Sequence, residues 1–164
     1  MRGGVLAAVI VSLALMVSAP LAGAAAKLPT ALISSMTIAS SSHATGARAV
    51  RLTVTLHYEM QCGYAGAGPL VVTFPSAVKL PKRFAAGAVQ LSSKAVAATV
   101  DGQRVTVTVA PHKGVMCDVM GPGSLVLAFT PAAKLSNPTQ PGSYRFTATH
   151  AKRVFAATLA VSAS

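Results

Sequence analysis

The chain has 164 residues, of which 52% are hydrophobic and only 10% are charged, and it contains no tryptophan. Fourteen Lys and Arg against three acidic residues give a formal net charge of +11 at pH 7, which favours anionic neighbours. With only three carboxylates, the chain has few residues for acid–base catalysis. Its few aromatic rings argue against a groove that stacks nucleic-acid bases and against a binding platform for neutral sugars.

The first 26 residues have the pattern of a cleavable export signal. A positive start at Arg2 precedes an apolar run over 5–17, and small residues at 24–26 suit a cleavage site. Because a spanning helix needs about 20 residues, we expect release into the periplasm or the exterior, with retention as an anchor as the alternative. Residues 27–164 then form one secreted domain with a net charge of +10, since Arg2 is removed.

Beyond Lys27, apolar and polar residues alternate with period two, which predicts an all-β chain. The clearest strand is 50–60, where residues 50, 52, 54, 56, 58 and 60 face a core and the intervening ones face water. Pro81 argues against a long helix in the turn-rich stretch 76–86. We expect about nine strands, at 32–40, 50–60, 70–74, 88–91, 95–100, 104–109, 124–130, 143–150 and 153–161.

The turn chemistry indicates how these strands are arranged. Asp101-Gly102 between two alternating runs predicts a β-hairpin joining 95–100 to 104–109. Turn signals recur about every eight to fifteen residues, the spacing of a sandwich or barrel. Two packed sheets are expected, because one open sheet leaves more strand edges to protect.

One series of turn residues resembles the pattern of a known protein family. Phe74-Pro75, Leu80-Pro81, Val89 and Asp101-Gly102 are followed by Asn137-Pro138 and by Pro141-Gly142-Ser143-Tyr144. This series resembles the immunoglobulin-like β-sandwich modules of bacterial and archaeal secreted and cell-surface proteins, including S-layer-type repeats. The resemblance implies an immunoglobulin-like antiparallel β-sandwich after the signal-peptide helix, with a role in adhesion, assembly or wall association. The lack of tandem copies argues against a lattice.

Tyr144 has a physical interpretation of its own. Pro138 and Pro141 restrict the backbone that enters the strand, and Gly142 can adopt conformations closed to other residues. The ring of Tyr144 can therefore be buried while its hydroxyl reaches a turn carbonyl. In the resemblance this residue is similar to the corner tyrosine of immunoglobulin-like sheets.

Cys62 and Cys117 are the only cysteines, and an exported chain with two cysteines predicts one disulfide. The pair closes a loop of 55 residues, and in the chain-entropy model such a closure stabilises a fold by about 4 kcal/mol. The bond ties two glycine-rich segments together, 61–69 and 111–123.

The sequence offers no catalytic residues, because it lacks a Gly-x-Ser-x-Gly elbow and both cysteines are explained by pairing. The favoured interpretation needs neither a cofactor nor a metal. The alternative is an extracytoplasmic copper- or zinc-binding protein built around the Cys62 and Cys117 segments, because sulfur with imidazole suits copper and imidazole with carboxylate suits zinc. Its candidate ligands are His57, Met60, His112, Met116 and Met120, although regular strand geometry places His57 and Met60 on opposite faces.

Lys79, Lys82 and Arg83 form the only tight basic group in the sequence, and the other basic residues are dispersed. They are the candidate polyanion-binding residues. Taken together, the sequence predicts a secreted or cell-surface, basic, non-catalytic module with a structural or binding role that associates with anionic wall or surface polymers. It predicts neither specific nucleic-acid binding nor a membrane span after signal cleavage, and it does not specify the oligomeric state.

Overall fold

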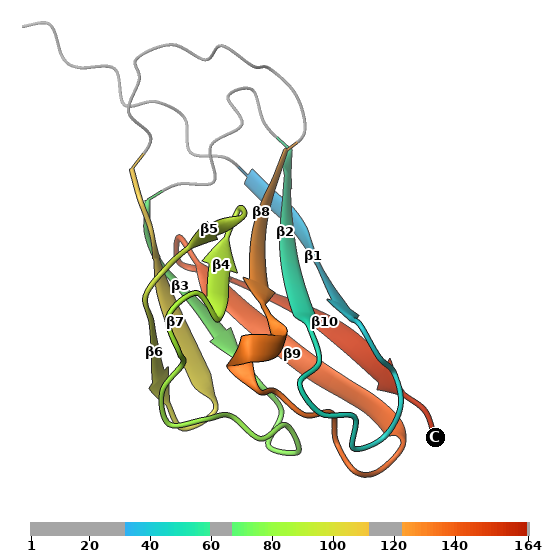
Figure 1. The fold of residues 1–164 in the computed structure, drawn as a ribbon. Helices are drawn as coiled ribbons and strands as arrows, with labels where there is room; N and C mark the ends of the chain where they lie inside the picture. The colour runs from blue at the N-terminus through green and yellow to red at the C-terminus, as the bar shows by residue number, and fades with distance from the viewer. Residues whose placement is uncertain (1–31, 60–66, 112–122, 164) are drawn as a thin grey trace, which may run out of the picture.

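The structure is a computed structural model, and it describes residues 32–59, 67–111 and 123–163. Two antiparallel sheets of five strands pack face to face (Figure 1). The first sheet has the order β1 (Leu32–Ser40), β2 (Leu52–Glu59), β8 (Gly123–Phe129), β4 (Val89–Leu91) and β5 (Lys94–Ala95). The second has the order β10 (Arg153–Val161), β9 (Gly142–His150), β3 (Gly68–Thr73), β7 (Arg104–Val109) and β6 (Ala98–Asp101).

This is the two-layer all-β sandwich that the alternation predicts. A short 3-10 helix, η1 (Pro131–Ala133), follows β8, and none of the described residues form a helix long and apolar enough to cross a membrane. The predicted export signal lies outside the described residues.

The strand order is that of an immunoglobulin-like sandwich. The neighbours β1, β2 and β8 occupy the places of strands A, B and E, and β10, β9 and β3 those of G, F and C. Between β3 and β8 the chain first adds β4 and β5 beside β8, and then crosses to the other sheet to add β6 and β7 beside β3. The described strands therefore contain the immunoglobulin-like core with an altered order at one side.

The core lies between the sheets and is built from the inward residues of each strand. In β2, Leu52, Val54, Leu56 and Tyr58 are buried and the residues between them are not, as the sequence predicts. Phe74 sits edge-on to Phe129 of the first sheet and to Phe146 of the second, with ring centroids 5.2 and 5.4 Å apart. Such edge-to-face contacts stabilise a core beyond the area that they bury, and here they join the two layers.

Most predicted strands begin and end within two residues of the observed bounds. The predicted single strand 95–100 is wrong, because β5 ends at Ala95 in one sheet and β6 begins at Ala98 in the other. A hairpin that the sequence analysis did not predict precedes this crossing. Its turn residues Ser92 and Ser93 have φ of 46° and 68°, a conformation that these residue types do not signal.

The Asp101-Gly102 hairpin is confirmed. Asp101 pairs with Arg104, so that two residues form the turn between β6 and β7. Gly102 occupies the first of these positions with a φ of 55°, which a residue without a side chain beyond hydrogen adopts at little cost. Beside it, the backbone N–H of Phe74 donates to the carbonyl of Gln103, 2.8 Å away, and links the turn to the end of β3.

The β9–β10 hairpin has a more strained turn. His150 pairs with Arg153, and both intervening residues, Ala151 and Lys152, have positive φ, at 48° and 64°. Two left-handed positions in a two-residue turn are best filled by Asn-Gly. Replacing Ala151 with Asn and Lys152 with Gly should therefore raise the free energy of unfolding by about 1–2 kcal/mol and the melting temperature by about 4–8 °C, measured by calorimetry.

The matched control is Ala151→Val, since a β-branched side chain tolerates this conformation worse than alanine; its melting temperature should fall. A melting temperature that does not rise in the Asn-Gly variant would contradict the assigned turn.

Cys62 and Cys117 lie outside the described residues, so the disulfide stays a prediction. The described strands on either side of the two cysteine segments are neighbours. Tyr58 near the end of β2 pairs with Gly123 at the start of β8, and Gly68 at the start of β3 pairs with Val109 at the end of β7. Both segments therefore leave and re-enter the described fold at the same end of the sandwich.

We expect the purified protein to contain a Cys62–Cys117 peptide on non-reducing peptide mapping. The double variant Cys62→Ser/Cys117→Ser should lose about 4 kcal/mol of unfolding free energy, because its unfolded chain is no longer cross-linked. Chemical denaturation of this variant beside the oxidised protein measures the difference. Two titratable thiols in the native protein would show that the pairing is wrong.

Candidate anion-binding site

Three connections meet at the end of the sandwich opposite the pairs Tyr58–Gly123 and Gly68–Val109: 41–51 between β1 and β2, 74–88 between β3 and β4, and 130–141 between β8 and β9 (Figure 1). Ser136 lies between the other two connections and forms isolated antiparallel bridges with both Arg48 and Lys79. Beside this bridge, the N–H of Val50 donates to the carbonyl of Leu135 at 3.1 Å. The three connections thus form a short extra sheet.

Asn137 holds two of these connections together. Its side chain is only 5% exposed, and its Nδ2 donates to the carbonyls of Ser42 and Ala44 at 2.8 and 2.9 Å. Its backbone N–H donates to the carbonyl of Ala47, and the carbonyl of Pro138 accepts from Gly46, both at 2.8 Å. The sequence predicts a turn at Asn137-Pro138. It does not predict the side-chain bonds of Asn137, because their acceptors lie almost a hundred positions away in the chain.

The β1–β2 connection is also tied to the end of β10. Thr45 donates its backbone N–H to the carbonyl of Ser162, and Ser162 donates to the carbonyl of His43, at 3.0 and 2.8 Å. The His43 ring is part of the same contact, with Nδ1 2.7 Å from the carbonyl oxygen of Ala160. The connection is therefore held by the β8–β9 connection and by β10.

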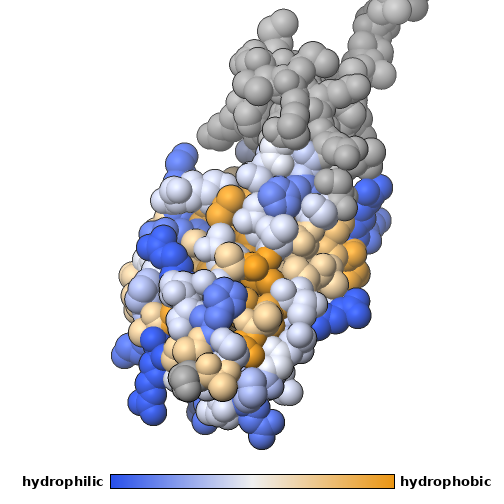
Figure 2. Space-filling view, turned by 90° about the vertical axis from the view of Figure 1, so that its right-hand side faces the viewer, coloured by the Kyte–Doolittle hydropathy of each residue, from blue (hydrophilic) through white to orange (hydrophobic). Residues whose placement is uncertain are grey.

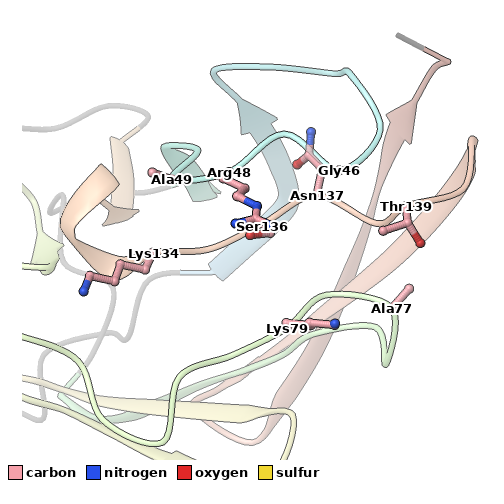
Figure 3. A pocket seen from close by; sticks show the side chains of 9 residues that line it. All are labelled: Gly46, Arg48, Ala49, Ala77, Lys79, Lys134, Ser136, Asn137 and Thr139. Atoms are coloured by element: carbon pink, nitrogen blue, oxygen red, sulfur yellow. The ribbon is translucent and has the colours of Figure 1, made fainter.

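A cavity of about 530 Å³ opens where the three connections meet (Figure 3). Because residues paired across antiparallel strands point to the same side, Arg48 and Lys79 flank the half-buried Ser136. In Figure 3 the Arg48 guanidinium lies beside Ser136, while Lys134 extends away from it. The lining contains three cations and no carboxylate: Gly46, Arg48, Ala49, Ala77, Lys79, Lys134, Ser136, Asn137 and Thr139.

The backbone around the cavity is strained at two places. Ala49 and Lys134 have φ of 52° and 54°, in the left-handed region that non-glycine residues avoid. The four other described non-glycine residues with positive φ all belong to two-residue hairpin turns, at 92–93 and 151–152. Lys134 ends η1, and its backbone N–H donates to the carbonyl of Pro131, so its left-handed conformation is that of a helix cap. Ala49 belongs to neither a hairpin turn nor a helix cap, and strain of this kind is found at functional sites.

The structure places the predicted basic group Lys79, Lys82 and Arg83 on the β3–β4 connection, with all three residues exposed. Of these, Lys79 lines the cavity. The expectation that the remaining basic residues are dispersed is wrong at this end, because Arg48 and Lys134 join Lys79 from connections far away in sequence. Long-range pairing through Ser136 brings them together, and no pattern along the chain reports it.

The alternative metal site gains nothing from the described residues. His57 lies on the outer face of β2, with Nε2 3.1 Å from Oγ1 of Thr37. The other candidate ligands, Met60, His112, Met116 and Met120, lie outside the described residues, and within these no three His, Cys, Asp or Glu side chains gather as a metal group. Among the described residues His150 is buried, which no motif in the sequence marks, and its Nδ1 lies 3.1 Å from the carbonyl oxygen of Pro69.

The prediction for Tyr144 is confirmed. Its ring packs against the core near the start of β9, and its hydroxyl donates to the carbonyl of Gln140 at 2.8 Å. This is the tyrosine corner of immunoglobulin-like sandwiches. It fixes the turn that follows the Asn137 segment and so supports the wall of the cavity.

No protein-family model and no curated protein matches the chain. Among solved structures, BslA, described as a bacterial hydrophobin, is 18% identical, with a TM-score of 0.46 over 79% of this chain and 100% of its own. The N-terminal domain of the Streptococcus gordonii adhesin Sgo0707 is 10% identical, with a TM-score of 0.44 over 79% of this chain and 32% of its own. A GH20 exo-β-N-acetylglucosaminidase from Vibrio harveyi is 12% identical, with a TM-score of 0.28 over 78% of this chain and 17% of its own. These likenesses are distant, and the function is inferred from the residues of this chain.

The contacts of Asn137 predict a large loss of stability on its replacement. Asn137→Ala leaves the part-buried carbonyls of Ser42 and Ala44 without their donor and should lower the free energy of unfolding by about 2 kcal/mol. Asn137→Asp keeps the shape but cannot donate, so it should cost at least as much. Urea unfolding measures both against Thr139→Ala, whose side chain is exposed two residues away and should change stability by less than about 0.5 kcal/mol. Equal unfolding of all three variants would contradict this role of Asn137.

Proposed function

We propose that this protein is an exported, non-catalytic β-sandwich module that associates with anionic polymers of the cell wall or cell surface. The contact is made by the basic end, which we define as Arg48, Arg51, Lys79, Lys82, Arg83 and Lys134. The export part of the proposal is supported by the N-terminal sequence pattern. The non-catalytic part is supported by the three carboxylates of the whole chain and by the lack of a nucleophile elbow.

The observation that carries the proposal is the gathering of six exposed cations from three connections at one end of the fold. A polyanion that lies across this end contacts charges that are fixed relative to one another, so several weak contacts add up. Exposed charges act through water and are screened by salt. The association is therefore expected to weaken steeply with ionic strength.

The outer face of the first sheet has few charges near its centre. Across the outer face of the first sheet, the neighbours Thr37, Thr55 and Val126 form a row without charge. Figure 2 shows the side on which β1 and β10 lie, with an apolar seam bordered by pale residues and with the most hydrophilic residues at its margins. Five other described cations are exposed outside the basic end, at Lys94, Arg104, Arg145, Lys152 and Arg153. The six cations of the basic end are the larger group, and such a group gives an orienting field that an evenly spread charge lacks.

Replacing Lys79, Lys82 and Arg83 with Gln should weaken retention on an immobilised anionic wall polymer by roughly 10- to 100-fold at low salt. The measurement is the salt concentration that elutes the protein, together with the affinity from a binding isotherm. The matched control removes the same charge at the opposite end by replacing Lys94, Lys152 and Arg153 with Gln.

The control variant should keep most of its retention. An equal loss in both triple variants would mean that net charge alone causes binding, and unchanged retention in both would mean that the charge only keeps the protein soluble. Either result contradicts the proposed function. Circular dichroism of both variants confirms that the fold is kept.

A further inference from the structure

We propose that the cavity formed by Arg48, Ser136 and Lys79 is a discrete site for a phosphate group, of the kind carried as an ester by anionic polymers and lipid headgroups. The inference rests on the proposed function, because the cavity lies within the basic end. It goes further by assigning one ligand chemistry to one set of side chains. The remaining cations of the basic end then attract the polymer by long-range electrostatics without contacting a particular group of it.

The bridges at Ser136 fix the three side chains in one row. Arg48 and Lys79 are each paired with Ser136 on opposite sides of the same segment. Cβ atoms of directly paired residues lie about 4.5–5.5 Å apart. The Arg48 guanidinium already lies beside Ser136, and Lys79, which extends toward Ala77 in Figure 3, is long enough to turn to an anion above the serine hydroxyl. An anion above Ser136 contacts a guanidinium, a hydroxyl and an ammonium group at once.

This donor set suits phosphate better than a carboxylate. Arginine presents a planar fork that binds two oxygens of an oxyanion, and lysine adds a mobile point charge. With the Ser136 hydroxyl, the site offers donors in three directions, which match a tetrahedral anion with three or four oxygens. The two positive charges also match a phosphate monoester, which carries about −1.5 to −2 near neutral pH.

The site is built on a fixed backbone. Asn137, next to Ser136, is locked by its bonds to Ser42 and Ala44. Ala49, next to Arg48, holds a left-handed conformation that neither a hairpin nor a helix cap requires. A preformed site loses less ordering entropy when its ligand binds, whereas a purely solubilising charge needs neither the lock nor the strain.

The cavity is also large enough for more than the anion. Its volume of about 530 Å³ is within the range of small-molecule sites. Thr139 and Ala77 line it beyond the phosphate position, on the side toward which Lys79 extends in Figure 3. We therefore expect the ester substituent, such as a glycerol unit, to lie between these residues.

The test uses variants that separate this site from the long-range attraction of the other cations. Arg48→Lys keeps the charge but removes the fork, and Ser136→Ala removes the hydroxyl without changing any charge. The ¹⁵N-labelled protein in its exported form is titrated with glycerol phosphate, inorganic phosphate and, as the carboxylate probe, glucuronate, while amide shifts are followed by NMR. Arg51→Lys, an equivalent exchange at an exposed residue outside the cavity lining, is the control.

We expect saturable shifts centred on 48–49, 79 and 134–137, with both phosphates bound at least tenfold more tightly than glucuronate. Arg48→Lys and Ser136→Ala should each weaken phosphate binding by about tenfold, the scale of one hydrogen bond to a charged group, while Arg51→Lys has no effect. Retention of both cavity variants on a carboxylate polymer without phosphate esters should stay close to that of the parent protein, because their charge is unchanged.

Shifts that do not saturate, or that spread equally to Lys82 and Arg83, would overturn the discrete site and leave polymer retention by the basic end standing. Equal affinity for glucuronate would overturn the phosphate assignment. Conversely, loss of polymer retention only in the Lys79/Lys82/Arg83 variant, with phosphate shifts absent in the parent protein, would confirm the proposed function and refute this inference. Comparing glycerol phosphate in solution with vesicles that carry phosphatidic acid separates a polymer source from a lipid source.

Discussion

The amide of Asn137 is the interaction on which the basic end depends. One NH₂ group satisfies two carbonyls, those of Ser42 and Ala44, at 2.8 and 2.9 Å, in a position almost closed to water. Buried backbone acceptors without a partner cost about 1–3 kcal/mol each, so the two connections are joined wherever Asn137 is in place. Without this contact, the β1–β2 connection still has its bonds to β10 and the backbone bonds beside Ser136, but it loses two bonds to the β8–β9 connection.

Because Asn137 joins the two connections, the backbone positions that carry the cations of the site are fixed relative to one another. Arg48 is carried by the connection that Asn137 holds, and Lys79 is paired to the same segment from the other side. Two cations that flank one serine repel each other, and no carboxylate among the lining residues offsets the repulsion. The packed loops, and not local charge balance, keep these residues together. An arrangement of this kind is stabilised further by any anion that binds it.

How much of this could be predicted depends on the range of the interaction. Period-two alternation is a local pattern, and it predicts the strands, the inward face of β2 and the all-β class. The Asp101-Gly102 turn and the Tyr144 corner are predictable for the same reason, because each depends on residues a few positions apart. The errors arise where distant packing decides. Residues 95–100 divide between two sheets because each half finds a different partner strand. The two-residue turn at 151–152 follows from the predicted strands on either side, although Ala151 and Lys152 do not signal its left-handed conformation. The site itself was seen only in part, since Arg48 and Lys134 join Lys79 through contacts between three separate connections.

The five residues from Lys134 to Pro138 show why site and stability are coupled in this fold. Leu135 is fully buried in the core, Ser136 is open to the cavity, and Asn137 points back into the neighbouring connection. In an extended segment successive side chains face opposite sides, so one short stretch can anchor itself in the core while it presents a polar group outward. The core contact and the Asn137 bonds set the position of Ser136 from both sides. A change in either neighbour therefore moves the Ser136 hydroxyl, whereas Ser136 itself can vary at little cost to the fold.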